Sequence, residues 1–182
     1  MSEAVGLIIA AIIAGVVAFF SLIISKEQSV SGFRQQWIDE LRKDIAVVAS
    51  CVSSIHGTSI SHKHDQELWD RVKADFTHFK EVIVRIRLRL NPHEKRKIEG
   101  PATMAVLGVL TELESIFGSA EPQFHKLEPL VTKLVTNANV ILKENWQRVR
   151  AGEPIYRITR GITLSLTGVV VIAWLLHLFK VI

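Results

Sequence analysis

The residues best suited to chemistry in this chain lie between His56 and Asp65. His56, His62 and His64 stand close to Asp65, and a His-x-His spacing can offer two ring nitrogens to one Zn²⁺ ion. The surrounding residues, HGTSISHKHD, also have the composition of a solvated loop, and neither a Cys pair nor an HExxH motif accompanies them. We therefore expect a loop without a metal, and a metal-dependent enzyme is the alternative.

A cluster of basic residues forms the second candidate site. Three arginines alternate with apolar residues at 85–89, and the basic triplet 95–97 follows them. Such a cluster can bind phosphate groups, although on a helix the three arginines spread over about 200° of the circumference. We predict a contact with anionic lipid or phosphate, and a solvated charged surface is the alternative. The residues predicted to make this contact are Arg85, Arg87, Arg89, Arg157 and Arg160.

The rest of the sequence lacks the motifs of the common enzyme families. It has no P-loop, no GxSxG and no dinucleotide-binding fingerprint. The single cysteine, Cys51, lies in an apolar stripe, so we expect a buried thiol rather than a nucleophile. A formal net charge of +4 suits anionic head groups and gives little reason to expect a nucleic acid partner. We expect no catalytic residue, cofactor or metal.

Two long apolar runs near the ends of the chain determine where the candidate sites between them lie relative to a membrane. Residues 5–25 contain no charged side chain, and residues 161–179 contain only His177 as an ionisable group. About 20 apolar residues suffice for a helix to cross the hydrocarbon core of a bilayer. No Lys or Arg precedes the first run, which argues against a cleaved signal peptide. We expect uncleaved transmembrane helices at 5–25 and 161–179.

Basic residues flank both runs on the side that faces the middle of the chain. Lys26 and Arg34 follow the first run, and Arg157 and Arg160 precede the second. Because Lys and Arg favour the cytoplasmic side of a membrane, segment 26–160 should be cytoplasmic and both termini should lie across the membrane. The lipid bilayer is therefore the first expected partner.

The middle segment repeats apolar residues at steps of three and four, which is the period of an amphipathic helix. These stripes cover residues 30–55, 65–90, 102–117 and 121–150. Residues 84–90 (VRIRLRL) alternate like a strand, but the helical period continues through them. Turn formers at 57–61 predict a break, and the sequence NPHE at 91–94 predicts the start of a new helix.

We therefore expect an all-α protein in which two transmembrane helices flank a cytoplasmic helical bundle of residues 26–160. No proline interrupts residues 5–55, so the first run can continue into the bundle as one helix, with Gly32 as the point most prone to a kink.

Small and aromatic residues are the candidates for helix packing, because small residues let membrane helices approach closely and aromatic residues anchor helix interfaces. The residues predicted to pack membrane helices are Ala11, Gly15, Ala18, Gly161 and Ser165. The residues predicted to form a helix interface are Phe33, Trp37, Leu41 and Trp146. Together they predict a homo-oligomer.

Three segments resemble the signatures of a family of uncharacterised bacterial and prophage membrane proteins. The segments are FRQQWIDELRKDIA at 33–46, RIRLRLNPHE at 85–94 and LKENWQRVRAGE at 142–153. The family pattern is FRxxWIxxLRxDIA, LxLNPxE and LKxEWxxVKxGE between two spans. This chain departs from it at Asn145 and Arg150, where the family usually has Glu and Lys. The resemblance covers most of the chain and implies a two-span protein of the bacterial inner membrane with periplasmic termini, but no catalytic residues.

These observations favour a non-enzymatic inner-membrane protein that self-associates and docks an unknown cytoplasmic protein partner. Phage exclusion or defence is the setting that the resemblance implies. One alternative is a pore-forming effector in which Thr163, Ser165 and Thr167 face a lumen. The other is a metal-dependent enzyme built on residues 56–65.

Reporter fusions test the predicted topology. Reporters fused at residues 2 and 182 should give a periplasmic signal, and a reporter inserted at Gly57 should give a cytoplasmic one, because of the basic flanks. A cytoplasmic signal from either terminus would contradict the two-span arrangement.

Overall fold

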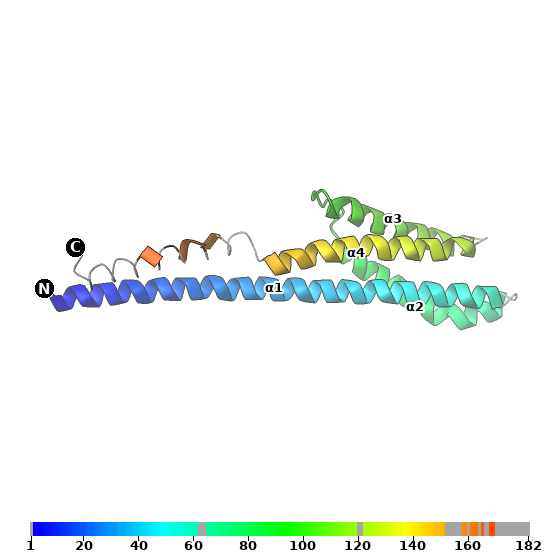
Figure 1. The fold of residues 1–182 in the computed structure, drawn as a ribbon. Helices are drawn as coiled ribbons and strands as arrows, with labels where there is room; N and C mark the ends of the chain where they lie inside the picture. The colour runs from blue at the N-terminus through cyan, green and yellow to red at the C-terminus, as the bar shows by residue number, and fades with distance from the viewer. Residues whose placement is uncertain are drawn as a thin grey trace. The chain divides into compact units, whose positions relative to one another are not determined.

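A single helix of 60 residues, α1 (Ser2–Ser61), contains both the first apolar run and the first stripe of the bundle (Figure 1). As expected from the lack of proline, it continues unbroken through Gly32. It is followed by α2 (Asp65–Arg89), α3 (Glu99–Phe117), the short 3₁₀ helix η1 (Phe124–Lys126) and α4 (Leu127–Ala151).

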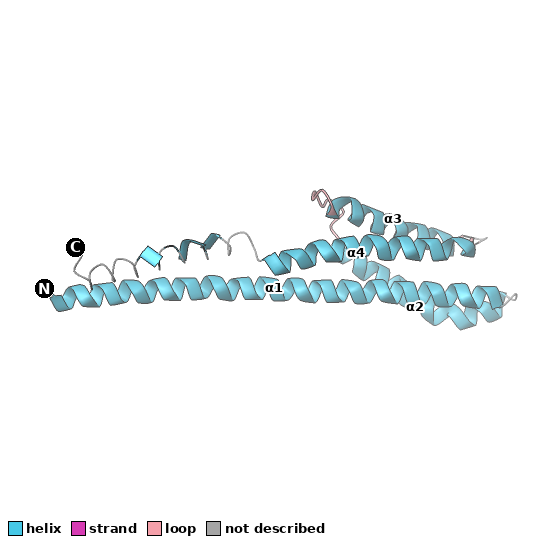
Figure 2. Cartoon of the chain, viewed as in Figure 1, coloured by secondary structure: helices cyan, strands magenta, loops and turns pink. Residues whose placement is uncertain are grey.

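The computed structural model describes residues 2–61, 65–119, 122–151, 158–159, 161–163, 165 and 168–169. Within α1 and α2 it does not describe the side chains of residues 2–6, 8–10, 12–13, 59–61, 65–69 and 71. Every regular element in these ranges is a helix, as Figure 2 shows, which confirms the all-α prediction.

The chain divides into two compact units. Residues Gln35–Gln147 form one, called here the bundle unit, and Met1–Arg34 with Arg148–Ile182 form the other, called the terminal unit. The predicted boundaries of the cytoplasmic domain, 26–160, are wider than those of the bundle unit.

The bundle unit is an up-and-down arrangement of antiparallel helices. Contacts between α1 and α2 join Asp44 to Arg85 and Ser54 to Asp75, so the residue numbers rise on one helix as they fall on the other. The start of α3 likewise meets the end of α4, where the Asn145 amide donates a hydrogen bond to Glu99. Antiparallel neighbours joined by short loops are the usual topology of helix bundles.

The predicted stripes supply most of the core. Fully buried side chains come from all four long helices, and they include Leu41, Ile83, Leu110 and Ile141. Phe79 packs edge-to-face on Phe117 with ring centroids 5.0 Å apart, and this pair joins α2 to α3. Met104, expected in the stripe of the third helix, is instead 56% exposed.

Two predicted boundaries are wrong. The helix α1 continues through the turn formers at 57–61, because a helix tolerates Gly, Ser and Thr when tertiary packing holds the neighbouring turns. The sequence NPHE forms a turn rather than a helix start, and α3 begins at Glu99. In that turn the Asn91 side chain accepts a hydrogen bond from the backbone N–H of His93 at 3.0 Å, which is a local alternative to helix capping.

The first turns of α3 and α4 each contain a proline. Pro101 lies in the first turn of α3 and Pro129 in the first turn of α4, where the missing N–H costs no internal hydrogen bond. Residues 84–89 are helical, so the strand alternative is excluded for them.

Among the residues that the structure describes, no helix is both long and apolar enough to cross a bilayer. The predicted runs 5–25 and 161–179 fall partly on residues outside the described set, and both stay predictions. In the described part of the first run, large apolar side chains are exposed to solvent. They are Leu7, Val16, Val17, Phe19, Leu22 and Ile24.

Replacement of one core residue tests the packing of the bundle. Leu110 is fully buried, so Leu110→Ala should lower the free energy of unfolding by about 2–5 kcal/mol through lost contacts and a cavity. The measurement is urea unfolding of the detergent-solubilised chain. Met104→Ala, on the same helix but exposed, is the matched control and should change stability by less than about 0.5 kcal/mol. Equal effects of the two variants would contradict the assigned core.

Candidate functional site

The most deeply buried charge of the described chain is the carboxylate of Asp44 on α1, which is 4% exposed. Arg85 and Arg89 on α2 both donate hydrogen bonds to it, with a distance of 3.1 Å from the Arg85 Nη2 to Oδ1. Arg89 also pairs with Glu40 at 2.7 Å, and Arg85 pairs with Glu81. A buried charge must be paired in this way, so the cluster fixes α1 against α2.

The charge of Glu40 is stabilised within this cluster. A hydrogen bond from the Gln36 side chain, followed by one from Arg89, lowers the pKa of Glu40 below its ordinary value of 4.5. Because the folded pKa is the lower one, the contribution to stability is present above pH 4.5 and is lost as the pH falls through the folded pKa.

Arg87, the third arginine of the predicted cluster, contacts α3 rather than α1. Its guanidinium lies 2.6 Å from Glu114 and 3.1 Å from the hydroxyl of Thr111, both on α3. Lys80, two turns earlier on α2, also reaches Glu114 at 3.3 Å. The structure therefore divides the predicted phosphate cluster: Arg85 and Arg89 pair toward α1, and Arg87 pairs toward α3. All three have carboxylate partners within the bundle.

A second buried polar contact joins the first residue of α3 to α4. Glu99 and Asn145 are each 6% exposed, and the Asn145 amide donates a hydrogen bond of 2.9 Å to the Glu99 carboxylate. The same amide group donates to the backbone oxygen of Ile141, and Arg96 pairs with Glu99 at 2.9 Å. Every described buried side-chain polar atom in the molecule has a hydrogen-bond partner.

These contacts join the three segments on which the sequence resemblance depends. Glu40 and Asp44 belong to the segment 33–46, and their partners Arg85 and Arg89 belong to the segment 85–94. The turn that ends that second segment is joined through Glu99 to Asn145, in the third segment, 142–153. The motif residues thus build the polar framework of the bundle.

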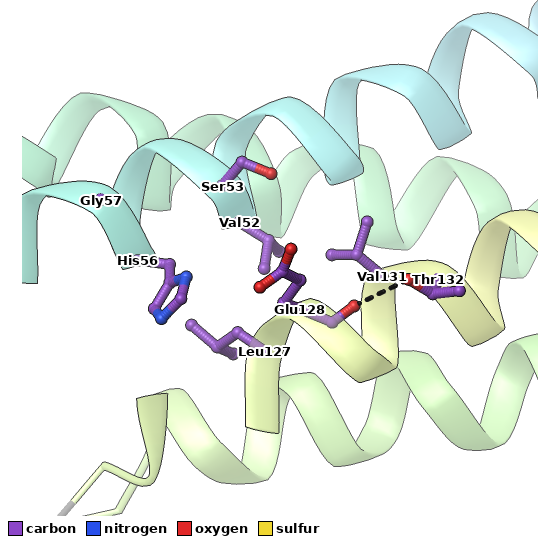
Figure 3. Close-up of a pocket in the computed structure, with 8 residues that line it drawn as sticks. All are labelled: Val52, Ser53, His56, Gly57, Leu127, Glu128, Val131 and Thr132. Carbon is purple, nitrogen blue, oxygen red and sulfur yellow. Dashed lines mark hydrogen bonds between the residues drawn. The ribbon is translucent and has the colours of Figure 1, made fainter. Parts of the chain in front are cut away.

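A pocket of about 350 Å³ lies between α1 and α4 at the opposite end of the bundle (Figure 3). The His56 ring from α1 and the Glu128 carboxylate from α4 lie at this pocket, and Val52, Leu127 and Val131 supply apolar walls. The Thr132 hydroxyl donates a hydrogen bond of 3.2 Å to the backbone oxygen of Glu128. The polar lining of the pocket thus includes one imidazole and one carboxylate.

The predicted alternative of a metal centre draws little support from this pocket. His62 and His64 lie outside the described residues. In the part of the chain that the structure covers, no group of three His, Cys, Asp or Glu side chains is arranged to hold a metal ion.

The single cysteine lies in the core, on the inner side of α1. Cys51 is 5% exposed, and burial raises the pKa of its thiol, with a smaller contribution from the Asp75 carboxylate. A thiol held in its neutral form is a poor nucleophile, in agreement with the expected packing role.

The residues predicted to pack helices have separate environments. Leu41 is 1% exposed in the core of its own bundle, Trp37 is half-buried, and Phe33 and Trp146 are 71% and 46% exposed. The other predicted packing residues, Ala11, Gly15, Ala18, Gly161 and Ser165, are all exposed. Arg157, Arg160 and Thr167 lie outside the described residues, and the Thr163 hydroxyl donates to the backbone oxygen of Thr159 at 2.8 Å.

Small residues of α1 continue beyond the predicted packing residues of the first run. Exposed small residues recur along this helix in three groups, with steps of four and three inside each group, and the larger residues Leu22, Gln36, Asp39 and Lys43 occupy the intervening positions of the same spacing. The members, called here the small-residue face, are Ala11, Gly15, Ala18, Ser25, Ser29 and Gly32 in the terminal unit and Ala46, Ser50, Ser53 and Gly57 in the bundle unit. A Cβ added at Gly15, Gly32 or Gly57 would meet no atom within 4 Å. The spacing of these small residues is a local pattern that the sequence contains beside the apolar stripe of the core.

No protein-family model matches the chain, and comparisons with curated proteins and with solved structures also gave no match. The family resemblance therefore stays a prediction.

The charge cluster can be tested by removal of its central carboxylate. Asp44→Ala leaves two arginines at a buried site without their main partner, so the free energy of unfolding should fall by about 3–5 kcal/mol. Asp39→Ala is the matched control, because Asp39 pairs with Arg42 on the exposed side of the same helix, and it should cost at most about 1 kcal/mol. Urea unfolding of both variants measures the difference, and a loss below 1 kcal/mol for Asp44→Ala would show that the cluster is solvated.

Proposed function

We propose that the protein is a non-enzymatic assembly protein of the bacterial inner membrane, held by its two apolar runs and presenting the helical bundle to a cytoplasmic protein partner. Self-association through α1 is part of this proposal. The observation that carries it is the character of α1, in which an apolar N-terminal part and the first helix of the bundle form one continuous helix.

Support for the membrane anchor comes from the distribution of exposed apolar side chains in the first run. At 100° per residue, Leu7, Leu22 and Phe19 project at about 0°, 60° and 120°, and Val16 and Val17 at about 180° and 280°. These side chains are 44–73% exposed. A helix that is apolar on every side has no water-facing surface, and a bilayer solvates such a helix.

Support for self-association comes from the small-residue face. Alternating steps of four and three keep residues on one side of a helix that supercoils around a partner, and small side chains let two such helices approach closely. Anchors in the same membrane would hold two copies of α1 parallel. The core of the bundle occupies Leu41, so the proposed contact uses the exposed small residues instead of the predicted interface there; of these, Ser53 and Gly57 also line the pocket between α1 and α4.

Support for a non-enzymatic role comes from the use of the charged groups. The carboxylates and arginines of the motif segments pair with one another between helices, and these pairs hold the bundle together. A catalytic group would instead have to be free to exchange a proton with a substrate.

Large side chains introduced on the small-residue face of α1 test the assembly. Gly15→Leu should lower the yield of crosslinked oligomer in native membranes by about tenfold or more, because a large side chain separates the helices, and it should not reduce insertion. Ser50→Leu should act in the same direction in the bundle unit, where the position is exposed and folding does not depend on it.

Val16→Phe is the matched control, because it adds bulk on another side of the same helix. A monomeric wild type, or an oligomer unchanged by Gly15→Leu, would contradict self-association. Leakage of a small dye from liposomes that contain the protein would instead favour the pore-forming alternative.

A further inference from the structure

The turn at 91–98 presents basic side chains at one particular end of the bundle unit. Arg89, just before the turn, pairs with Glu40 near the start of that unit, and Glu99, just after it, accepts a hydrogen bond from Asn145 near its end. The turn therefore lies at the end where α1 enters the unit at Gln35 and where α4 leaves it at Gln147. This end is called here the entry end.

The chain ties the entry end to both apolar runs. Only about ten residues of α1 separate Ser25, at the end of the first run, from Gln35, where the bundle unit begins. If the first run is held in a bilayer, the entry end is the part of the bundle that the chain keeps closest to the membrane surface. In this one respect the inference below depends on the proposed membrane anchor.

The charge of the turn suits an anionic surface. Lys95, Arg96 and Lys97 are exposed, and Glu94 is the one acidic residue among positions 91–98. Arg96 neutralises Glu94 at 3.3 Å and also reaches Glu99. Among the described residues neither Lys95 nor Lys97 has an ion-pair partner, so both ammonium groups can reach a ligand, and the net charge of positions 94–99 is +1. By contrast, the guanidinium groups of Arg85, Arg87 and Arg89 already have carboxylate partners.

The conformation of the turn is held by its own hydrogen bonds. The backbone N–H of Gly100 donates to the carbonyl of Arg96 at 2.8 Å, and the N–H of Arg96 donates to the Glu94 carboxylate at 3.0 Å. The absence of a Cβ at Gly100 is required, since an added carbon would collide with the backbone oxygen of Glu94. The turn ends in Ile98, an apolar side chain that is 56% exposed. Basic side chains beside an exposed apolar one are typical of membrane-surface contacts.

We infer that the turn 91–98 is a docking surface for the anionic head groups of the same bilayer that holds α1, with Lys95 and Lys97 as the contact residues and Ile98 entering the interfacial region. Each Lys near an anionic surface strengthens binding about fivefold, so the two together favour the docked state about 30-fold. The contact would hold the bundle by a third point besides its two chain connections.

The test uses the full chain with a fluorescent reporter at position 98. A single Ile98→Cys in a Cys51→Ala background is labelled with a polarity-sensitive dye, and the protein is placed in nanodiscs of phosphatidylglycerol or of phosphatidylcholine. Emission should be brighter and shifted to the blue in the anionic discs, and 0.5 M NaCl should reverse the change. Lys95→Gln with Lys97→Gln should lower the ratio of docked to undocked protein about 30-fold.

Two controls separate the possible explanations. A dye at Ser119→Cys, at the far end of α3, should not respond to lipid charge. Inorganic phosphate added to phosphatidylcholine discs should have no effect; if it reproduces the blue shift, the site binds free phosphate and the lipid proposal is wrong.

Equal emission in the two kinds of disc, or a response that survives replacement of both lysines, would also overturn the proposal. Failure of the membrane anchor itself is detected separately, because the protein would then not co-elute with the discs before any fluorescence is measured.

Discussion

The buried carboxylate of Asp44 is the interaction on which the bundle most depends. Removed from water, it has to be compensated, and two arginines from the neighbouring helix provide that compensation. Because these arginines stand one turn apart, they can meet Asp44 in only one register of α2 against α1. Apolar side chains tolerate small shifts along a helix interface, whereas a charge pair at a buried site does not. Register, and with it the position of the following turn, is therefore set by charge.

The buried contact between Glu99 and Asn145 fixes the register of α3 against α4, as the contacts of Asp44 fix α1 against α2. Together the two contacts place the turn between α2 and α3 beside Glu40, near the start of the part of α1 that belongs to the bundle unit, and beside the end of α4. The apolar core then needs only the right side chains at the right faces, and Phe79, Phe117 and Leu110 fill it. Polar groups thus decide the arrangement of the helices, and apolar groups supply most of the stability.

The helices were readable from the sequence because their apolar period of three to four residues is long and regular. The stripe at 65–90 predicted α2 to within one residue, whereas the stripe at 121–150 predicted α4 with a start six residues too early, because α4 begins at Leu127. Two turns were not readable for physical reasons. The residues at 57–61 remain helical because packing outweighs their weak helix propensity. The sequence NPHE forms a turn in which the Asn91 side chain accepts a hydrogen bond from the backbone N–H of His93, and the same residues could equally have started a helix.

The roles of the arginines at 85–89 could not be assigned from the sequence alone. Spacing along one helix shows in which directions side chains project but not which carboxylates stand opposite. Apart from Glu81, which pairs with Arg85 on the same helix, their carboxylate partners lie about 25 to 50 positions away in the chain, on α1 and α3, and only the folded topology brings them together. The small-residue face of α1 was different, since its heptad spacing is local and was available before the structure.

The contact between Glu99 and Asn145 also constrains how this sequence can diverge. At position 145 an ionised Glu could not donate a hydrogen bond. A Glu there would set two carboxylates against each other at a buried site, and one of them would have to hold a proton or be replaced. Positions 99 and 145 should therefore covary among related chains, with an acidic residue at one matched by a donor at the other.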